Sequence, residues 1–210
     1  MAAKVAAGRR VVDPARSWRS SLDRYVALLR GVNVGRAKRL TMADLRALLE
    51  GLGCTDVRTL LNSGNAVYSA PAGCAGRHGA RIEAALARDL GLSCAVIVKS
   101  ATEIEAALAG NALRAVATEP SRMLVAFTGD EAALSELAPL RKNDWTPELL
   151  QLGKHAAYVW CPRGVIDSKL LLAMDRLLGD RLTTRNWSTV GKIAALLRTP
   201  DGPRLAGSIN

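Results

Sequence analysis

Residues 24–34 read RYVALLRGVNV, and this stretch sets the architecture that we expect for the chain. Up to Leu29 it is an almost continuous apolar run, which is typical of a strand in the middle of a sheet. Gly31, Asn33 and Gly35 then interrupt the run, so we expect a loop after the strand. A central strand has neighbours on both sides, and the sequence downstream supplies candidates for them.

The sequence that follows alternates between helix and strand patterns. Thr41 is a typical N-cap for the first helix, which Gly51 and Gly53 end. Asn62-Ser63-Gly64-Asn65 between two short apolar runs indicates a tight hairpin. The expected elements are a helix at 41–52, strands at 57–61 and 66–69, a helix at 80–90, a strand at 94–99 and a helix at 102–109.

The second half repeats this order of elements, although its direct sequence identity with the first half is weak. Gly153-Lys154 is the expected hairpin turn, and Asp167 is the expected cap of a strong helix that ends at Gly179. The expected elements are a strand at 123–128, a helix at 130–137, strands at 148–152 and 156–160, a helix at 167–178, a strand at 182–184 and a helix at 188–197.

These patterns predict an α+β fold: a tandem duplication of two ferredoxin-like (βαββαβ) units, with antiparallel sheets and helices packed on one face. A single mixed α/β sheet is the alternative. The predicted divisions are a disordered extension at 1–22, a first ferredoxin-like subdomain at 23–112, a second at 120–200 and a tail at 201–210. The composition of the 210 residues, 49% hydrophobic and 23% charged, excludes a collagen, a coiled coil, a disulfide scaffold and a largely disordered chain.

The formal net charge of +10 is concentrated in three segments. Residues 24–46 hold six bases and one acid, residues 181–198 hold four bases and no acid, and residues 1–23 hold five bases against two acids. Residues 47–180, in contrast, hold 13 bases and 15 acids. Basic segments attract phosphates, nucleic acid or an anionic membrane surface, and they also occur as solvated surface.

The four cysteines indicate neither a metal site nor a disulfide framework. Cys54, Cys74, Cys94 and Cys161 form no C-x-x-C pair and have no histidine at ligand spacing. All but Cys74 lie in apolar surroundings and are expected to be buried. No run of 18 apolar residues exists, and the first 22 residues lack the apolar core of a secretory signal. We therefore expect a cytoplasmic protein with reduced thiols, no metal, no cofactor and no membrane contact.

The first candidate site is the loop after the opening strand, with Arg30, Asn33, Gly35, Arg36 and Lys38. A strand that leads into a Gly-rich loop before a helix can hold an anion on its backbone N–H groups. The spacing matches neither a P-loop nor G-x-G-x-x-G. A structural interpretation is also open, in which the glycines permit positive φ and Asn33 bonds nearby backbone.

The second candidate site is Thr183–Lys192, at the start of the final helix. Arg185 could form a bidentate contact with a phosphate or carboxylate, Trp187 could stack on a base, and Lys192 adds charge. Thr184, Asn186 or Ser188 could cap the helix. In the structural interpretation Asn186 only caps the final helix, Trp187 packs in the core and Arg185 forms an ion pair with an acidic side chain.

Three function hypotheses follow. The leading one is a non-catalytic or weakly catalytic binding protein for a phosphate-bearing ligand, a nucleotide or nucleic acid, held by the two basic motifs. An RNP-type aromatic motif is absent from the sequence. The second is an enzyme on a small anionic substrate between the two halves, polarised by Asn33, Ser63, Asn65 and Arg185. The third is a structural or interaction module that forms a homodimer. His78 and His155 lie in no recognisable triad context, and no carboxylate pair stands out.

Three motifs in order carry a resemblance to a known family: Leu29-Arg30-Gly31-Val32-Asn33-Val34-Gly35, then Ser63-Gly64-Asn65, then residues 183–190, TTRNWSTV. They resemble the signatures of domain-of-unknown-function family 1697 (DUF1697), and Asp167-Ser168-Lys169-Leu170 looks like that family's helix start. Asn62 and Arg36 depart from the pattern, which has Gln and Gly there. The resemblance implies a bacterial cytoplasmic protein with duplicated ferredoxin-like halves, and it implies no activity.

Overall fold

Strand β1 lies at the centre of the first of two sheets. The computed structural model describes residues 22–33, 39–72 and 75–199. Residues 25–29 are buried on both faces, which explains why that part of the strand has no polar alternation. The strands of this antiparallel sheet, in the order β2-β3-β1-β4, are β2 (Thr55–Leu60), β3 (Asn65–Pro71), β1 (Leu22–Leu29) and β4 (Val96–Ser100).

The second sheet has the same arrangement of its own four strands. All its pairings are antiparallel, and its order is β6-β7-β5-β8. The strands are β5 (Met123–Thr128), β6 (Leu149–Leu152), β7 (Ala157–Trp160) and β8 (Leu182–Asn186). The expectation of an α+β fold with antiparallel sheets is confirmed, and the alternative of a single mixed sheet is wrong.

Six α-helices accompany the sheets in the described part of the chain. Two pack on the outer face of each sheet: α1 and α2 on the first, α4 and α5 on the second. The helices are α1 (Met42–Gly51), α2 (Ala75–Leu90), α3 (Ala101–Ala109), α4 (Glu131–Ser135), α5 (Lys169–Leu178) and α6 (Trp187–Arg198). Short 3-10 helices are η2 (Ala112–Ala115), η3 (Ala138–Lys142) and η4 (Gly179–Arg181).

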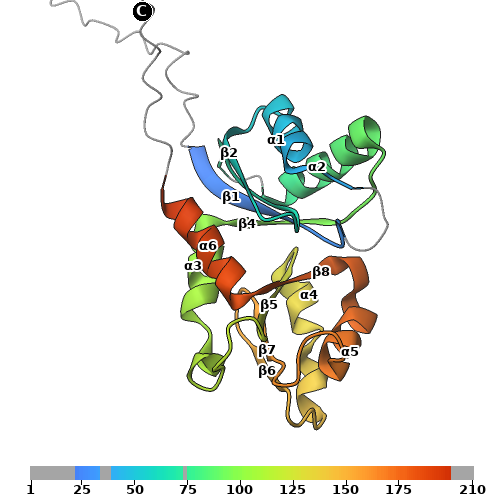
Figure 1. The fold of residues 1–210 in the computed structure, drawn as a ribbon, viewed down its shortest axis with the longest axis vertical. Helices are drawn as coiled ribbons and strands as arrows, with labels where there is room; N and C mark the ends of the chain where they lie inside the picture. Colours follow the sequence, from blue (N-terminus) through green and yellow to red (C-terminus); the bar gives the residue numbers. More distant parts are fainter. Residues whose placement is uncertain (1–21, 34–38, 73–74, 200–210) are drawn as a thin grey trace, which may run out of the picture.

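The inner faces of the two sheets contribute to one shared core. Figure 1 shows α3 and α6 side by side along one flank of both sheets, and the two helices are in contact. Residues from both sheets and both helices form a single buried cluster, including Val26, Leu28, Val67, Ile97, Ile104, Val125, Phe127, Tyr158, Val190 and Ile193. Both faces of the sheets are therefore covered, whereas the sequence predicted helices on one face.

Two local predictions are wrong at the level of single residues. The predicted helix at 80–90 excludes His78, but α2 begins at Ala75 and His78 lies inside it. The cap of α5 is Ser168 rather than Asp167, because the Ser168 hydroxyl accepts the N–H of Leu171 at 3.0 Å. Glycine lowers helix propensity, so the sequence placed the start of α2 too late. Aspartate and serine are both good helix caps, so the sequence alone did not decide between Asp167 and Ser168.

The thiols are less uniformly buried than expected. Cys161 is buried, whereas Cys54 and Cys94 are half-buried beside the outer core of the first sheet. Cys74 lies outside the described residues. Within the described ranges, no helix is long and apolar enough to cross a membrane.

Candidate functional site

Arg185 on β8 lies at the junction of the two halves, and it brings the predicted motifs together. Its Nε donates to Oδ1 of Asn65 at 2.5 Å, and its Nη2 donates to the carbonyl of Leu29 at 2.7 Å. Nη2 also lies 3.3 Å from the Ser63 carbonyl and 3.4 Å from that of Gly64. These partners come from the end of β1 and from the β2–β3 hairpin.

The guanidinium is buried, and each of its nitrogens donates a hydrogen bond to the protein. Its Nη1 donates to Oγ1 of Thr183 at 2.9 Å and to the carbonyl of Thr184 at 2.8 Å, so all three nitrogens have partners. Only 9% of Arg185 is exposed, and none of these partners is a carboxylate. Burial lowers the pKa of Arg185 to about 10, which leaves the group protonated at neutral pH. The cation is thus stabilised by neutral oxygens of the protein itself.

The hairpin that receives Arg185 depends on Gly64. This residue has a φ of +72°, which a glycine adopts without strain. A Cβ there would lie 2.5 Å from Cγ2 of Val32 and 2.8 Å from Cβ of Leu29. The Leu29 N–H donates to the Gly64 carbonyl at 2.8 Å, so the turn packs directly on the end of β1. The Ser-Gly-Asn motif therefore has a steric explanation.

Asn65 and Asn33 both have their amides committed to nearby groups. The Nδ2 of Asn65 donates to the Leu60 carbonyl and to Oγ of Ser63, each at 3.0 Å. Asn33, at φ +58°, donates from Nδ2 to the carbonyls of Leu40 and Asn62. Its Oδ1 accepts the Leu40 N–H at 2.9 Å. The side chain therefore ties this loop to the hairpin, as in the structural interpretation of the motif.

Arg30, the first base of the loop motif, is paired with acids of the second half. It forms ion pairs with Asp175 and, at 3.2 Å, with Asp180. Its Nη1 donates to the Leu182 carbonyl at 2.7 Å. A hollow of about 260 Å³ lies beside these groups. The predicted site residues Gly35, Arg36 and Lys38 lie outside the described residues.

The remaining predicted residues lie at the start of α6. Asn186 caps the helix by accepting the Thr189 N–H at 2.8 Å. Trp187 is half-buried and packs against the shared core. Lys192 is exposed and forms no hydrogen bond or ion pair with the described residues. The structure thus brings Asn65, Ser63 and Arg185 into one network and leaves Lys192 apart from it in its contacts.

A cavity that the sequence did not indicate lies in the second half. It has a volume of about 420 Å³ and lies between the segment 144–148 and the segment 163–169. Trp145 lines it, half-buried, and its Nε1 donates to the Leu140 carbonyl at 2.7 Å, which fixes the indole in place. Arg163 and Lys169 line it as exposed cations without an ion pair to any described residue.

Three carboxylates line the same cavity. Oε2 of Glu148 accepts the Leu170 N–H at 3.0 Å, and Oδ1 of Asp144 accepts the N–H and the hydroxyl of Thr146. The Thr146 donors hold the pKa of Asp144 below its usual range. Asp167 is exposed and makes no hydrogen bond to a described residue. The cavity wall therefore has charges of both signs.

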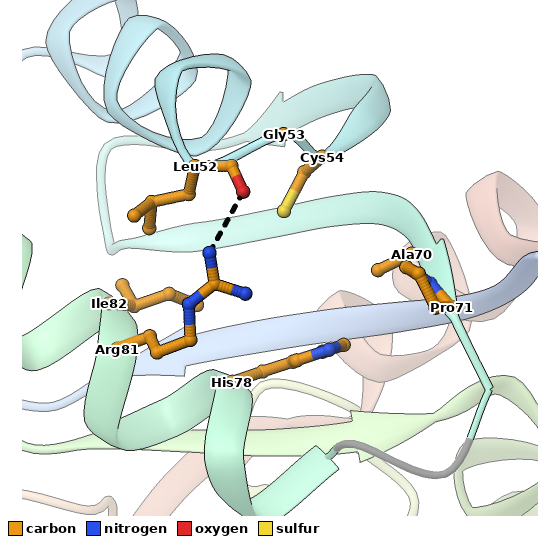
Figure 2. Close-up of a pocket in the computed structure, with 8 residues that line it drawn as sticks. All are labelled: Leu52, Gly53, Cys54, Ala70, Pro71, His78, Arg81 and Ile82. Carbon is orange, nitrogen blue, oxygen red and sulfur yellow. Dashed lines mark hydrogen bonds between the residues drawn. The ribbon is translucent and has the colours of Figure 1, made fainter.

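A much smaller hollow, of about 30 Å³, lies on the outer side of the first sheet. Figure 2 shows Cys54, His78 and Arg81 around it, with the Arg81 guanidinium donating to the Leu52 carbonyl at 3.1 Å. The Nδ1 of His78 lies 3.1 Å from the Tyr68 hydroxyl. Burial raises the pKa of the Cys54 thiol, partly opposed by Arg81. A protonated thiol in so small a space does not indicate a nucleophilic site.

Sequence reasoning missed the larger cavity because its two walls lie far apart along the chain. Trp145 and Arg163 belong to loops that precede β6 and follow β7, and Lys169 is the first residue of α5. The pairing of β6 with β7 brings those loops to the same end of the sheet. Asp167 and Lys169 do belong to a segment that the sequence singled out as a helix start. The sequence therefore pointed to one wall of the cavity, at Asp167 and Lys169, and gave no sign of the wall formed by residues 144–148.

Comparison with known proteins identifies the family. A family model described as "Protein of unknown function (DUF1697)" matches residues 22–158, so the chain belongs to that family. No curated protein matches the chain. Among solved structures, the conserved bacterial protein SP0830 from Streptococcus pneumoniae is similar, with 24% identity and a TM-score of 0.66. The match covers 84% of this chain and 99% of that one, and it shows a likeness of fold.

Proposed function

We propose that this member of the DUF1697 family is a non-catalytic binding protein for a small molecule with an acidic group, held in the 420 Å³ cavity. The observation that carries the proposal is the pair Arg163 and Lys169. Both line the cavity, and neither has a carboxylate partner among the described residues. An acidic group on a ligand would supply that partner, with Arg163 offering a planar, bidentate donor set.

The size and lining of the cavity favour a small molecule over a polymer. Its volume lies within the range of roughly 300–1,000 Å³ that is common for small-molecule sites. The fixed indole of Trp145 offers an apolar surface for the ligand body. Nucleic-acid binding on a sheet surface is disfavoured because both sheets bury their inner faces in the shared core.

The predicted anion site at Arg30–Lys38 and Thr183–Lys192 stays a prediction. An anion there would compete with the protein oxygens that occupy Arg30 and Arg185. Lys192 has no such competitor among the described side chains. The enzyme between the two halves and the dimerising module also stay predictions, and no contact within the described chain favours either of them.

We also infer that the two units are ferredoxin-like and arose by duplication. The first strand of each unit is central, the third and fourth flank it, and the second lies at the edge. Each unit carries a helix after its first and its third strand, in the βαββαβ order. This recurrence supports duplication although the direct sequence identity between the halves is weak.

A ligand screen on paired variants tests the proposed binding. The full chain is screened by thermal shift against sugar phosphates, nucleotides, small carboxylates and oligonucleotides. A ligand at 100 times its Kd should add about 2.7 kcal/mol to the free energy of unfolding. The double variant R163A/K169A should lose the shift. The matched double variant R176A/K192A removes an exposed Arg and an exposed Lys outside the cavity lining and should keep it.

Two outcomes would contradict the proposal. One is the absence of a shift with every compound. The other is an equal loss of the shift in both double variants, which would indicate general electrostatic attraction. A shift lost only in R176A/K192A would instead favour the motif at the start of α6.

A further inference from the structure

The carboxylates that line the cavity restrict the class of ligand that it can bind. We infer that the ligand is a small zwitterion of the amino-acid class, with a carboxylate and a protonated amine on one compact body. This inference rests on the proposed function, since it concerns the same cavity.

The balance of charge is the first step. Three carboxylates and two cations line the cavity, so a ligand with only negative groups would bring like charge to the carboxylates. A ligand with only positive groups would leave Arg163 and Lys169 without partners. A molecule with one group of each sign can satisfy both kinds of side chain.

The hydrogen bonds indicate which carboxylate faces the amine. Glu148 is committed to the N–H of Leu170 at the start of α5, and Asp144 is committed to Thr146. Asp167 forms no hydrogen bond or ion pair with the described residues, and it is two residues from Lys169. We therefore place the ligand's ammonium group at Asp167 and its carboxylate at Arg163 and Lys169.

Trp145 provides the surface for the rest of the ligand. Its indole is held by the 2.7 Å hydrogen bond to the Leu140 carbonyl and packs against the outer core of the second sheet. A fixed aromatic surface can pack an aliphatic or aromatic body, and it also attracts a nearby ammonium group. A compact amino acid would contact the two cations, the carboxylate of Asp167 and the indole of Trp145 together.

The experiment compares three forms of the same compound. The free L-amino acids are screened by thermal shift with the full chain, and binding of the best ones is measured by calorimetry. Their N-acetyl derivatives, which lack the positive charge, and their amides, which lack the negative charge, are measured in parallel. We expect both derivatives to bind at least about tenfold more weakly than the free amino acid.

A variant separates this inference from the proposed function. D167N should weaken the free amino acid but not the N-acetyl derivative, whereas R163A should weaken both. D23N, which changes an exposed aspartate on β1 outside the cavity lining, should change neither. N-acetyl compounds or phosphates that bind as well as the free amino acids would overturn the zwitterion inference and leave the proposed function standing. No binding by any compound would overturn both.

Discussion

The Nε of Arg185 donates to Oδ1 of Asn65 across 120 positions of sequence, and this bond joins the two halves at their buried junction. The same guanidinium reaches the Leu29 carbonyl, 156 positions away. A positive charge is here surrounded by neutral oxygens that belong to turns and strand ends. The three motifs that the sequence analysis singled out thus meet in a junction that fixes one half against the other.

Replacing Arg185 by lysine should destabilise the protein strongly. Lysine keeps the charge but lacks the planar set of five N–H donors, so buried oxygens of Asn65 and Leu29 would lose their donors. We expect a loss of about 3 kcal/mol or more in the free energy of unfolding, measured with urea. R176K, at an exposed position without a described partner, should stay within about 0.5 kcal/mol. A loss in R185K as small as the one in R176K would show that the junction contributes little to the free energy of unfolding.

Gly64→Ala should also be costly. The new Cβ would lie 2.5 Å from Cγ2 of Val32, and the φ of +72° is unfavourable for alanine. Overpacking and backbone strain together should cost about 2 kcal/mol or more. A thermal unfolding curve for this variant that overlies the wild-type curve would argue against close packing of the hairpin on β1.

Gly191→Ala should have the opposite effect. Gly191 lies inside α6, is exposed, and a Cβ there would meet nothing within 4 Å. Alanine restricts the unfolded chain more than glycine, so the variant should gain roughly 0.5–1 kcal/mol. The gain is measured by thermal and urea unfolding alongside G64A. A loss of stability at this position would mean that α6 does not tolerate a side chain on its outer surface.

The stability of the protein should fall as the pH decreases below about 6.5. Burial, with a smaller contribution from Arg81, lowers the pKa of His78 from its ordinary value of 6.5. Above pH 6.5 the imidazole is neutral in both states. Below it, the unfolded chain binds a proton that the folded chain does not, so the free energy of unfolding decreases until the folded pKa is reached.

Urea unfolding at pH 7.5, 6.5 and 5.5 measures this decrease. Glu103 and Asp144 have pKa values below their usual range, which keeps their titration out of this window. H78Q should flatten the pH dependence. An unchanged slope in H78Q would mean that another group is responsible.

Much of the architecture could be predicted because local patterns and tertiary structure agree. The strand at 123–128 has the predicted bounds, and Thr41 caps α1 as expected, accepting the Asp44 N–H at 3.0 Å. The hairpin around Gly153 also forms at its predicted place. In each case the signal lies within a few residues, so neighbouring elements do not need to be known.

The role of Arg185 could not be predicted, because its partners are remote in sequence. Two threonines, an arginine and an asparagine before a helix indicate an anion site as readily as a structural cation. Only the folded chain shows the Leu29 and Ser63 carbonyls beside the guanidinium. The cavity at Trp145 could not be predicted for a related reason, since segments on the two sides of the β6–β7 hairpin supply its walls.

The shared inner core has a consequence for how the two halves depend on each other. Val26 and Leu28 of β1 are fully buried against groups that include Phe127 of β5, so each half provides the cover for the other's sheet. The boundary between the halves therefore separates topological units but not thermodynamic ones, and the chain should melt as one cooperative unit. A half produced alone would present a bare apolar sheet and would associate with whatever could cover it, a second copy of itself included.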